Sequence, residues 1–384
     1  LLRLPEQISF AKLRASWAQV GNDTDPYKTA KYYNTSAFPG SASVSPTLYN
    51  ARFKPEISNS IEVGLDWRMF KQRFGLDLAF YNNITRNQIL DVPMDQTTGY
   101  TKATMNSGKV RNRGIELQLD GTPVKTKNFT WNSTFTWAKN YNKVLSLAAG
   151  LTDGQTIAYT GGTNCALIAK VGGSIGDIYG KAFVRDAAGN IVYETEGDYK
   201  GLPLVEGDGN TVKVGNANPV FMMGWDHTFS YKGFSLYFLL DWRYGGKVLS
   251  QTQAEMDLYG VSEITADARD RGYVMLEGQQ IDNVKGFYKN VVGGRAGVTE
   301  YYMYDATNLR LREVSLSYNF SKKWIQKTKV LKDVQLSFVA RNLCFLYKKA
   351  PFDPDLVLST GNDNQGIEVF GMPTTRSLGF TLKC

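Results

Sequence analysis

The chain has 384 residues, a mean hydropathy of −0.31 and a formal net charge of +8. No apolar run approaches the length of about 18 residues that a membrane-spanning helix needs, which excludes a helical membrane protein. Lysine and arginine are scattered through turns, loops and polar strand positions, with no basic helix or cluster, so the charge does not indicate a nucleic-acid partner. The chain opens directly into a strand pattern without a secretory signal, and we therefore expect a mature fragment that lacks its N-terminal part.

The predicted elements begin with an alternating segment over residues 11–17 and continue with a hairpin over residues 58–82. In the first arm of the hairpin, from Ser60 to Met69, every odd position is apolar and every even position is polar or glycine. After a turn at residues 71–73, the alternation resumes. Because successive side chains of a strand point to opposite sides, the hairpin has one apolar face and one charged face.

The same alternation recurs along the rest of the chain, at residues 115–120, 129–137, 221–229, 234–242, 314–320, 334–340 and 378–384. Its phase changes once, between Leu311 and Val314, which predicts a bulge near Arg312 and Glu313. About ten such strands, each near ten residues long with aromatic residues at the ends, are typical of an outer-membrane β-barrel. The sequence therefore predicts an all-β, transmembrane, antiparallel barrel.

The connections between the predicted strands alternate between short and long. Short links are expected at residues 71–73, 121–128, 231–233 and 321–332, and long ones at residues 21–54, 90–106, 144–217, 248–305 and 346–373. In an antiparallel sheet this order places all tight turns at one end and all long loops at the other, as in barrels with periplasmic turns and extracellular loops. Within one long loop, Asp186 to Glu194 is predicted to form a surface hairpin with its turn near Gly189 and Asn190.

The alternation also predicts which side chains face lipid and which face the lumen. The apolar phase is expected to place Trp67, Trp137, Leu236, Phe238 and Trp242 against lipid. The polar phase is expected to place Glu62, Asp66, Asp77, Glu116 and Asp241 in the lumen. Arg111 and Arg113 are expected to lie on the polar face with Glu116, in ion pairs that line the lumen or touch a plug. Trp and Tyr near strand ends favour interfacial girdles over simple core positions.

Residues that could carry chemistry are few, and we predict no enzyme. The single histidine, His227, lies on the apolar phase of a strand, which argues against a metal-binding or general-base role. Cys165, Cys344 and Cys384 are far apart in the sequence, so free thiols are expected. No Ser/His/Asp set can be drawn. We predict no catalytic, cofactor-binding or metal-binding residue, and the sequence identifies no substrate-binding residue.

One polar loop could bind Ca²⁺. Residues 361–368 and the carboxylates of Asp353 and Asp355 bring acids and amides together in it. Their spacing does not match an EF-hand loop, and a polar surface loop is the favoured interpretation.

A set of motifs carries a family resemblance. They are FKPEISNSIEVGLDWRMF (residues 53–70), NSGKVRNRGIELQLDG (106–121), LLDWRYGGKV (239–248), LRLREVSLSYNF (309–320), ARNL (340–343) and RSLGFTLKC (376–384). In order and spacing they resemble the C-terminal barrel half of SusC/RagA-like TonB-dependent outer-membrane transporters. The family usually ends on an aromatic residue, whereas this chain ends on Cys384. No TonB box, plug domain or N-terminal extension is visible. The resemblance implies that residues 1–384 supply about the last ten strands of a 22-stranded barrel.

The resemblance also implies a function. Family members import oligosaccharides or peptides across the outer membrane with energy supplied through TonB, beneath a SusD-like surface lipoprotein. The TonB contact would lie in the missing N-terminal part, and the ligand contacts in the plug and the long loops. Two alternatives stay open: a passive porin of about ten strands, and a soluble carbohydrate-binding or hydrolytic β-protein. Neither the ligand class nor the oligomeric state can be read from a barrel half.

Overall fold

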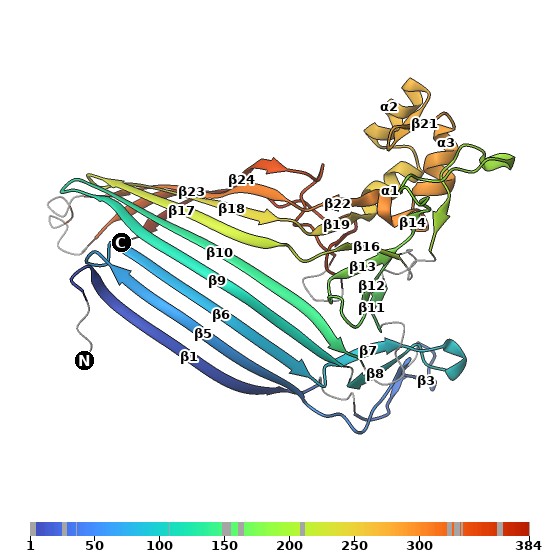
Figure 1. Cartoon of the computed structure of the whole chain (residues 1–384), viewed down its shortest axis with the longest axis horizontal. Coiled ribbons are helices and arrows are strands. Elements are labelled where there is room, and N and C mark those ends of the chain that lie inside the picture. The colour runs from blue at the N-terminus through green and yellow to red at the C-terminus, as the bar shows by residue number, and fades with distance from the viewer. Residues whose placement is uncertain are drawn as a thin grey trace.

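Ten antiparallel strands form one curved sheet that dominates the molecule (Figure 1). The computed structural model describes residues 5–24, 29–35, 37–106, 108–147, 155–159, 165–207, 212–320, 325, 331, 333–358 and 364–383. The strands of the sheet, in spatial and chain order, are β1 (Ile8–Asn22), β5 (Glu56–Met69), β6 (Phe74–Arg86), β9 (Lys109–Lys125), β10 (Phe129–Ser146), β17 (Phe221–Tyr231), β18 (Phe234–Tyr244), β23 (Asn308–Asn319), β24 (Gln335–Lys348) and β26 (Ser377–Lys383). Within the described part of the chain, β1 and β26 each pair with one strand, so the sheet is an open wall.

The register of the strands separates the two faces as the sequence predicts. On the outer face, one level carries Trp67, Leu76, Leu119, Phe135, Trp225 and Leu240 on neighbouring strands. The inner face carries the acidic residues of the ten strands, which are Glu56, Glu62, Asp66, Asp77, Glu116, Asp120, Asp226, Asp241 and Glu313. The predicted faces are confirmed for Trp67, Trp137, Leu236, Phe238 and Trp242 on the outer side and for Glu62, Asp66, Asp77, Glu116 and Asp241 on the inner side.

The prediction for Arg111 and Arg113 is wrong. The register pairs Ile115 with Phe80 and Arg113 with Asn82 without a shift, so both arginines share the outer face with Ile115. Arg113 and Arg111 are three and five positions before Glu116, and an odd difference in position places two side chains on opposite faces of a strand. They therefore do not pair with Glu116.

The predicted bulge is confirmed. The pairing of β23 shifts register against β18 between Leu239 and Leu240, and against β24 between Leu311 and Glu313. Arg312 is the extra residue in β23, and it accounts for the change of phase in the sequence. Its guanidinium lies on the inner side, where it pairs with Asp241.

The short and long connections separate to opposite ends of the sheet, as predicted (Figure 1). The turn between β5 and β6 contains Phe70, Lys71 and Gln72 with φ of 52°, 56° and 64°. The turn between β17 and β18 is Lys232 and Gly233, with φ of 44° and 91°. These left-handed residues let the chain reverse within two to four positions. The helices and small sheets lie at the other end.

The long connections contain more regular structure than the sequence predicts. Their strands are β2 (Tyr33–Thr35), β3 (Ala42–Val44), β4 (Thr47–Leu48), β7 (Ile89–Pro93), β8 (Lys102–Asn106), β11 (Gln155–Tyr159), β12 (Cys165–Ala169), β13 (Asp177–Gly180), β14 (Ala182–Phe183), β15 (Val205–Glu206), β16 (Val212–Asn216), β19 (Lys247–Ser250), β20 (Val274–Leu276), β21 (Gln279–Ile281), β22 (Met303–Asp305) and β25 (Ile367–Glu368). Their helices are α1 (Gln251–Leu258), α2 (Glu263–Arg271) and α3 (Val284–Gly286). No helix in the described ranges is long and apolar enough to cross a membrane.

The largest buried apolar cluster lies in these connections and not on the sheet. It joins Leu167 and Ile178 of one connection to Phe287, Val292 and Tyr302 of the next, all at most 1% exposed. Burying each large side chain stabilises the folded state by roughly 1.5–3 kcal/mol. By contrast, the outer face of the sheet leaves Trp17 and Phe380 68% and 78% exposed. The loops therefore form a folded layer with its own core.

Candidate functional site

Ion pairs line the inner face of the sheet. Arg14 of β1 donates two hydrogen bonds to Asp77 of β6, at 2.6 and 3.1 Å, and its Nε lies 3.7 Å from Glu62. Arg68 of β5 lies 2.8 Å from both Asp66 and Asp120. These pairs are about one-third exposed, and such pairs contribute at most about 1 kcal/mol each. Their main effect is to keep the wall polar and hydrated.

A cavity of about 640 Å³ follows this charged band across the wall. Its lining comes from strands β1, β5, β6, β9, β10, β17, β18 and β23, and its charged and polar members include Arg14, Glu62, Asp77, Glu116, Gln118, Thr136, Asp241 and Arg312. Its charged lining holds four carboxylates, between Arg14 of β1 and Arg312 of β23. The surface suits the hydrated passage of a polar solute or contact with another polar protein domain.

Nearer the long loops, the inner wall changes from charged to neutral side chains. The Asn112 Oδ1 atom accepts hydrogen bonds from Asn140 at 3.2 Å and from Asn142 at 2.9 Å. The Ser58 hydroxyl donates to Asn83 at 2.5 Å. A second cavity, of about 650 Å³, lies beside this band and is lined by Asn140, Asn142, Ser174, Lys213, Asn216 and Asn218 among others. Amide and hydroxyl groups both donate and accept hydrogen bonds, so the mouth of the wall, its end beside the long loops, can bind polar ligands that donate or accept hydrogen bonds.

The last long connection is attached to the wall through a buried arginine. Arg310 of β23 is 1% exposed, and its Nη2 atom lies 2.8 Å from Asp353 and 3.0 Å from Asp355. The guanidinium also packs 4.2 Å from the centre of the Phe345 ring. Because Arg310 lies on the inner phase of β23, the connection between β24 and β26 packs against the inner wall near the mouth.

A second arginine joins two long connections to each other. Arg185 lies 2.8 Å from Glu277 and 2.9 Å from Glu300. Hydrogen bonds from Arg185 lower the pKa of the Glu277 carboxyl below its usual range. The hairpin predicted at residues 186–194 is confirmed beside it: Asp186 N donates to Asn190 O, and the turn passes through Gly189 at a φ of 89°. The two connections therefore form one extracellular body.

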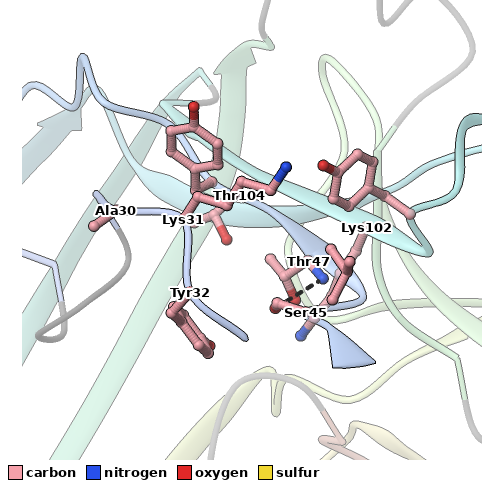
Figure 2. A pocket seen from close by; sticks show the side chains of 10 residues that line it. Ala30, Lys31, Tyr32, Ser45, Thr47, Lys102 and Thr104 are labelled. Carbon is pink, nitrogen blue, oxygen red and sulfur yellow. Dashed lines mark hydrogen bonds between the residues drawn. The ribbon is translucent and has the colours of Figure 1, made fainter. Parts of the chain in front are cut away.

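A small tyrosine-rich pocket lies at the tips of the first two long connections (Figure 2). It encloses about 100 Å³, and its lining includes Tyr32, Tyr49 and Tyr100. Figure 2 shows Thr47 beside Ser45, with the Thr47 N–H donating to the Ser45 hydroxyl at 3.3 Å. The pocket is too small for an oligomeric ligand, although it could hold one ring or side chain of such a ligand.

The histidine and two of the cysteines considered for chemistry lie in surroundings that indicate a structural role. His227 is 6% exposed on the outer phase of β17, and its Nδ1 atom accepts a 3.1 Å hydrogen bond from the Trp131 indole. Cys165 and Cys344 are free thiols, and Cys384 lies outside the described residues. In the described ranges, no three His, Cys, Asp or Glu side chains come together as metal ligands.

The expectation of a polar surface loop is wrong for Asp353 and Glu368. Asp353 is 7% exposed and Glu368 4% exposed. Arg310 binds the Asp353 carboxylate, and the hydroxyls of Ser250 and Thr252 donate to Glu368 at 2.9 and 2.6 Å. Residues 361–363 of the loop considered for Ca²⁺ lie outside the described part of the chain.

Comparison with known proteins decides the family. Residues 4–343 match the family described as "TonB dependent receptor-like, beta-barrel". The chain belongs to the TonB-dependent receptors. It is 25% identical to TonB-dependent receptor P3 of Formosa agariphila, over 98% of the chain and 39% of that protein. It is 23% identical to TonB-dependent receptor SusC of Bacteroides thetaiotaomicron, over 85% of the chain and 31% of that protein.

The fold agrees with solved structures of this family. The match to the RagAB peptide importer in its closed-closed state covers 99% of this chain and 41% of the importer's chain, with a TM-score of 0.73 at 17% identity. The open-open state gives a TM-score of 0.70 at 18% identity. This chain is therefore a SusC/RagA-like, outer-membrane β-barrel sequence. It spans about two-fifths or less of the length of the relatives it matches.

Proposed function

We propose that residues 1–384 form the C-terminal portion of a wider barrel, and that the complete protein imports nutrients through it with energy supplied through TonB. The observation that supports this most is the open, ten-stranded wall whose inner face is charged and whose outer face is apolar. A barrel closed from ten strands alone would have an interior largely filled by side chains. A wider barrel needs a plug, because an open lumen of that width would leak.

The cargo in this proposal is an oligosaccharide or a peptide, delivered beneath a SusD-like surface lipoprotein. The RagAB peptide importer, whose fold this chain shares, supports the peptide class. The oligosaccharide class rests on the resemblance of the sequence motifs to the SusC/RagA-like family. The surface of the folded extracellular body supports the proposal of a lipoprotein partner. Between α1 and α2 it exposes Tyr259 and Val261, which are 74% and 72% accessible, beside the half-exposed Ile264. Exposed apolar side chains of this kind are typical of protein-binding surfaces.

Energised import can be distinguished from passive diffusion in whole cells. We would express the full-length protein and its neighbouring lipoprotein, and measure uptake of labelled neutral oligosaccharides and labelled peptides. A protonophore, or deletion of the host TonB protein, should abolish uptake of the transported class. Uptake that survives both treatments would contradict TonB coupling and support the porin.

The lipoprotein surface has its own test. The double variant Tyr259→Glu, Val261→Glu should reduce co-purification of the lipoprotein, because two charges would enter an apolar contact. A matched double variant at exposed positions near the periplasmic turns, Phe70→Glu and Tyr231→Glu, should leave co-purification unchanged. Equal retention in both variants would place the partner elsewhere.

A further inference from the structure

A cluster of six cations lies on the outer face of the wall, at its extracellular end. This basic outer patch consists of Arg86 of β6, Lys109, Arg111 and Arg113 of β9, and Lys139 and Lys143 of β10. The register places Arg86 beside Lys109, and Arg111 beside Lys143. Since outward side chains on one strand are about 7 Å apart and neighbouring strands about 4.8 Å apart, the six charges cover one continuous area.

The patch has no acidic counterpart in the described part of the chain. No carboxylate there lies within 4.0 Å of any of its six basic groups. The acidic residues of the ten strands all lie on the inner face. One patch atom is also buried without a hydrogen-bond partner, the Arg111 Nε. An uncompensated positive cluster of this kind attracts an anionic partner.

The patch continues directly into the lipid-facing surface. Immediately toward the periplasmic side lie Phe80 and Ile115, paired at one level, and then Leu117 and Trp137 at the next. Tyr141 lies within the patch, 47% exposed, with Lys139 Nζ 4.8 Å and Arg113 Cζ 5.8 Å from its ring centre. A partner that fits both parts has an anionic head at the level of the cations and apolar chains along the rows below.

We propose that the basic outer patch binds an outer-leaflet lipid with a phosphorylated headgroup. Guanidinium groups bind phosphate oxygens through paired N–H donors, and ammonium groups add point charge. Basic residues beside a membrane surface contribute about 1 kcal/mol each to binding of anionic lipid. A soluble anion would use the cations alone, whereas a lipid uses the adjoining apolar rows as well. The site is separate from the route of the cargo, which follows the inner face.

The test uses the full-length protein in detergent micelles and bisphosphorylated lipid A as the probe, with bound lipid counted by native mass spectrometry. The triple variant Arg111→Gln, Arg113→Gln, Lys139→Gln should bind the probe roughly 100-fold more weakly, at about fivefold for each charge removed. The variant Arg111→Lys, Arg113→Lys keeps the charge and should retain most of the affinity. Heat-modifiable migration on a gel confirms that each variant is folded.

The control removes three cations from the opposite end of the wall, with Lys125→Gln, Lys127→Gln and Lys232→Gln. It should bind the probe as the wild type does. Lipid A stripped of its phosphates should bind weakly, and inorganic phosphate in large excess should not displace lipid A. The proposal is overturned if the triple variant keeps full affinity, if the control loses as much, or if dephosphorylated lipid binds equally well. Displacement by inorganic phosphate would overturn it too, since the site would then take a free anion.

Discussion

At the scale of single residues, the position of a side chain in the strand alternation decides its environment. Leu239 and Leu240 are neighbours of the same type on β18, but they face opposite sides. Leu239 is level with Asp226 and Glu313 on the inner face. Leu240 is level with Trp225 and Leu311 on the outer face. The same substitution at both positions therefore measures the difference between lipid and lumen.

We predict that Leu240→Arg destabilises the full-length barrel by about 2–4 kcal/mol, the cost of a cation at the lipid-facing midplane. Leu239→Arg should cost much less, because water and the carboxylates of Asp226 and Glu313 are within reach of its side chain. Denaturant titration in detergent or lipid, followed by tryptophan fluorescence, measures both. Equal losses would mean that both faces meet the same environment.

Arg310 and Arg341 form a second informative pair. Both lie on the inner side of the wall and pair with acids, but the Arg310 side chain is 1% exposed and the Arg341 side chain 62%. Arg310→Met should cost about 3–5 kcal/mol, since it leaves the buried Asp353 carboxylate without its cation. Arg341→Met should cost less than about 1 kcal/mol. Limited proteolysis should cut residues 349–358 faster in the first variant only, and equal resistance would show that Arg310 does not hold that connection.

At the scale of elements, the strands were predictable and the loop structure was not. Alternation identifies each wall strand because one face meets lipid and the other water, so every second residue is constrained. The helix α1 carries no such pattern: its buried residues are Gln251, Ala254 and Asp257. Asp257 is satisfied there by Ser262 at 2.5 Å and by Tyr302 at 2.9 Å. Tyr302 is 45 positions from Asp257 and becomes its neighbour only in the fold, as Arg310 does for Asp353.

The basic outer patch was missed for a related reason. Lys109, Arg111 and Arg113 lie within five residues, but the other three cations are at positions 86, 139 and 143, so no short window contains the whole patch. Only the register of three strands brings them together. The alternation itself places Arg111 and Arg113 on the outer face, because both are an even number of positions from Ile115 and an odd number from Glu116.

One contact between elements predicts a dependence on pH. Asp305, at the end of β22, accepts hydrogen bonds from Thr307 and from Lys349. Burial alone would raise the pKa of Asp305, but the hydrogen bonds outweigh it and lower the pKa to about 2. A depressed carboxyl pKa stabilises the folded state above the ordinary value of 3.8, and that stabilisation is lost as the pH falls toward 2.

We therefore expect Asp305→Asn to lower the melting temperature at pH 6, and the difference from wild type to shrink as the pH falls from about 4 toward 2. Thermal unfolding of the two proteins across that range is the measurement. Asp186→Asn, in the exposed hairpin, serves as a comparison for a carboxylate bound within its own turn. A difference for Asp305→Asn that stays constant with pH would show that the ionised carboxylate does not contribute.

At the scale of the whole molecule, the open wall predicts that residues 1–384 do not form a pore alone. The backbone groups along the free edges of β1 and β26 would remain unpaired, and lipid cannot satisfy them. The isolated chain should give neither a heat-resistant band on a gel nor stable conductance in planar bilayers. A closed barrel with steady conductance would instead support the small porin.

The central claim is that this wall separates lipid from an aqueous lumen, and spin labels along β18 test it most directly. Single cysteines at positions 235 to 242 would be labelled in the full-length protein, without its native cysteines, in lipid bilayers. Collision with oxygen should peak at even positions, and collision with a water-soluble nickel complex at odd positions. A flat profile, or the reverse alternation, would contradict the assignment of the two faces. It would also contradict the proposed transport function, which depends on that assignment.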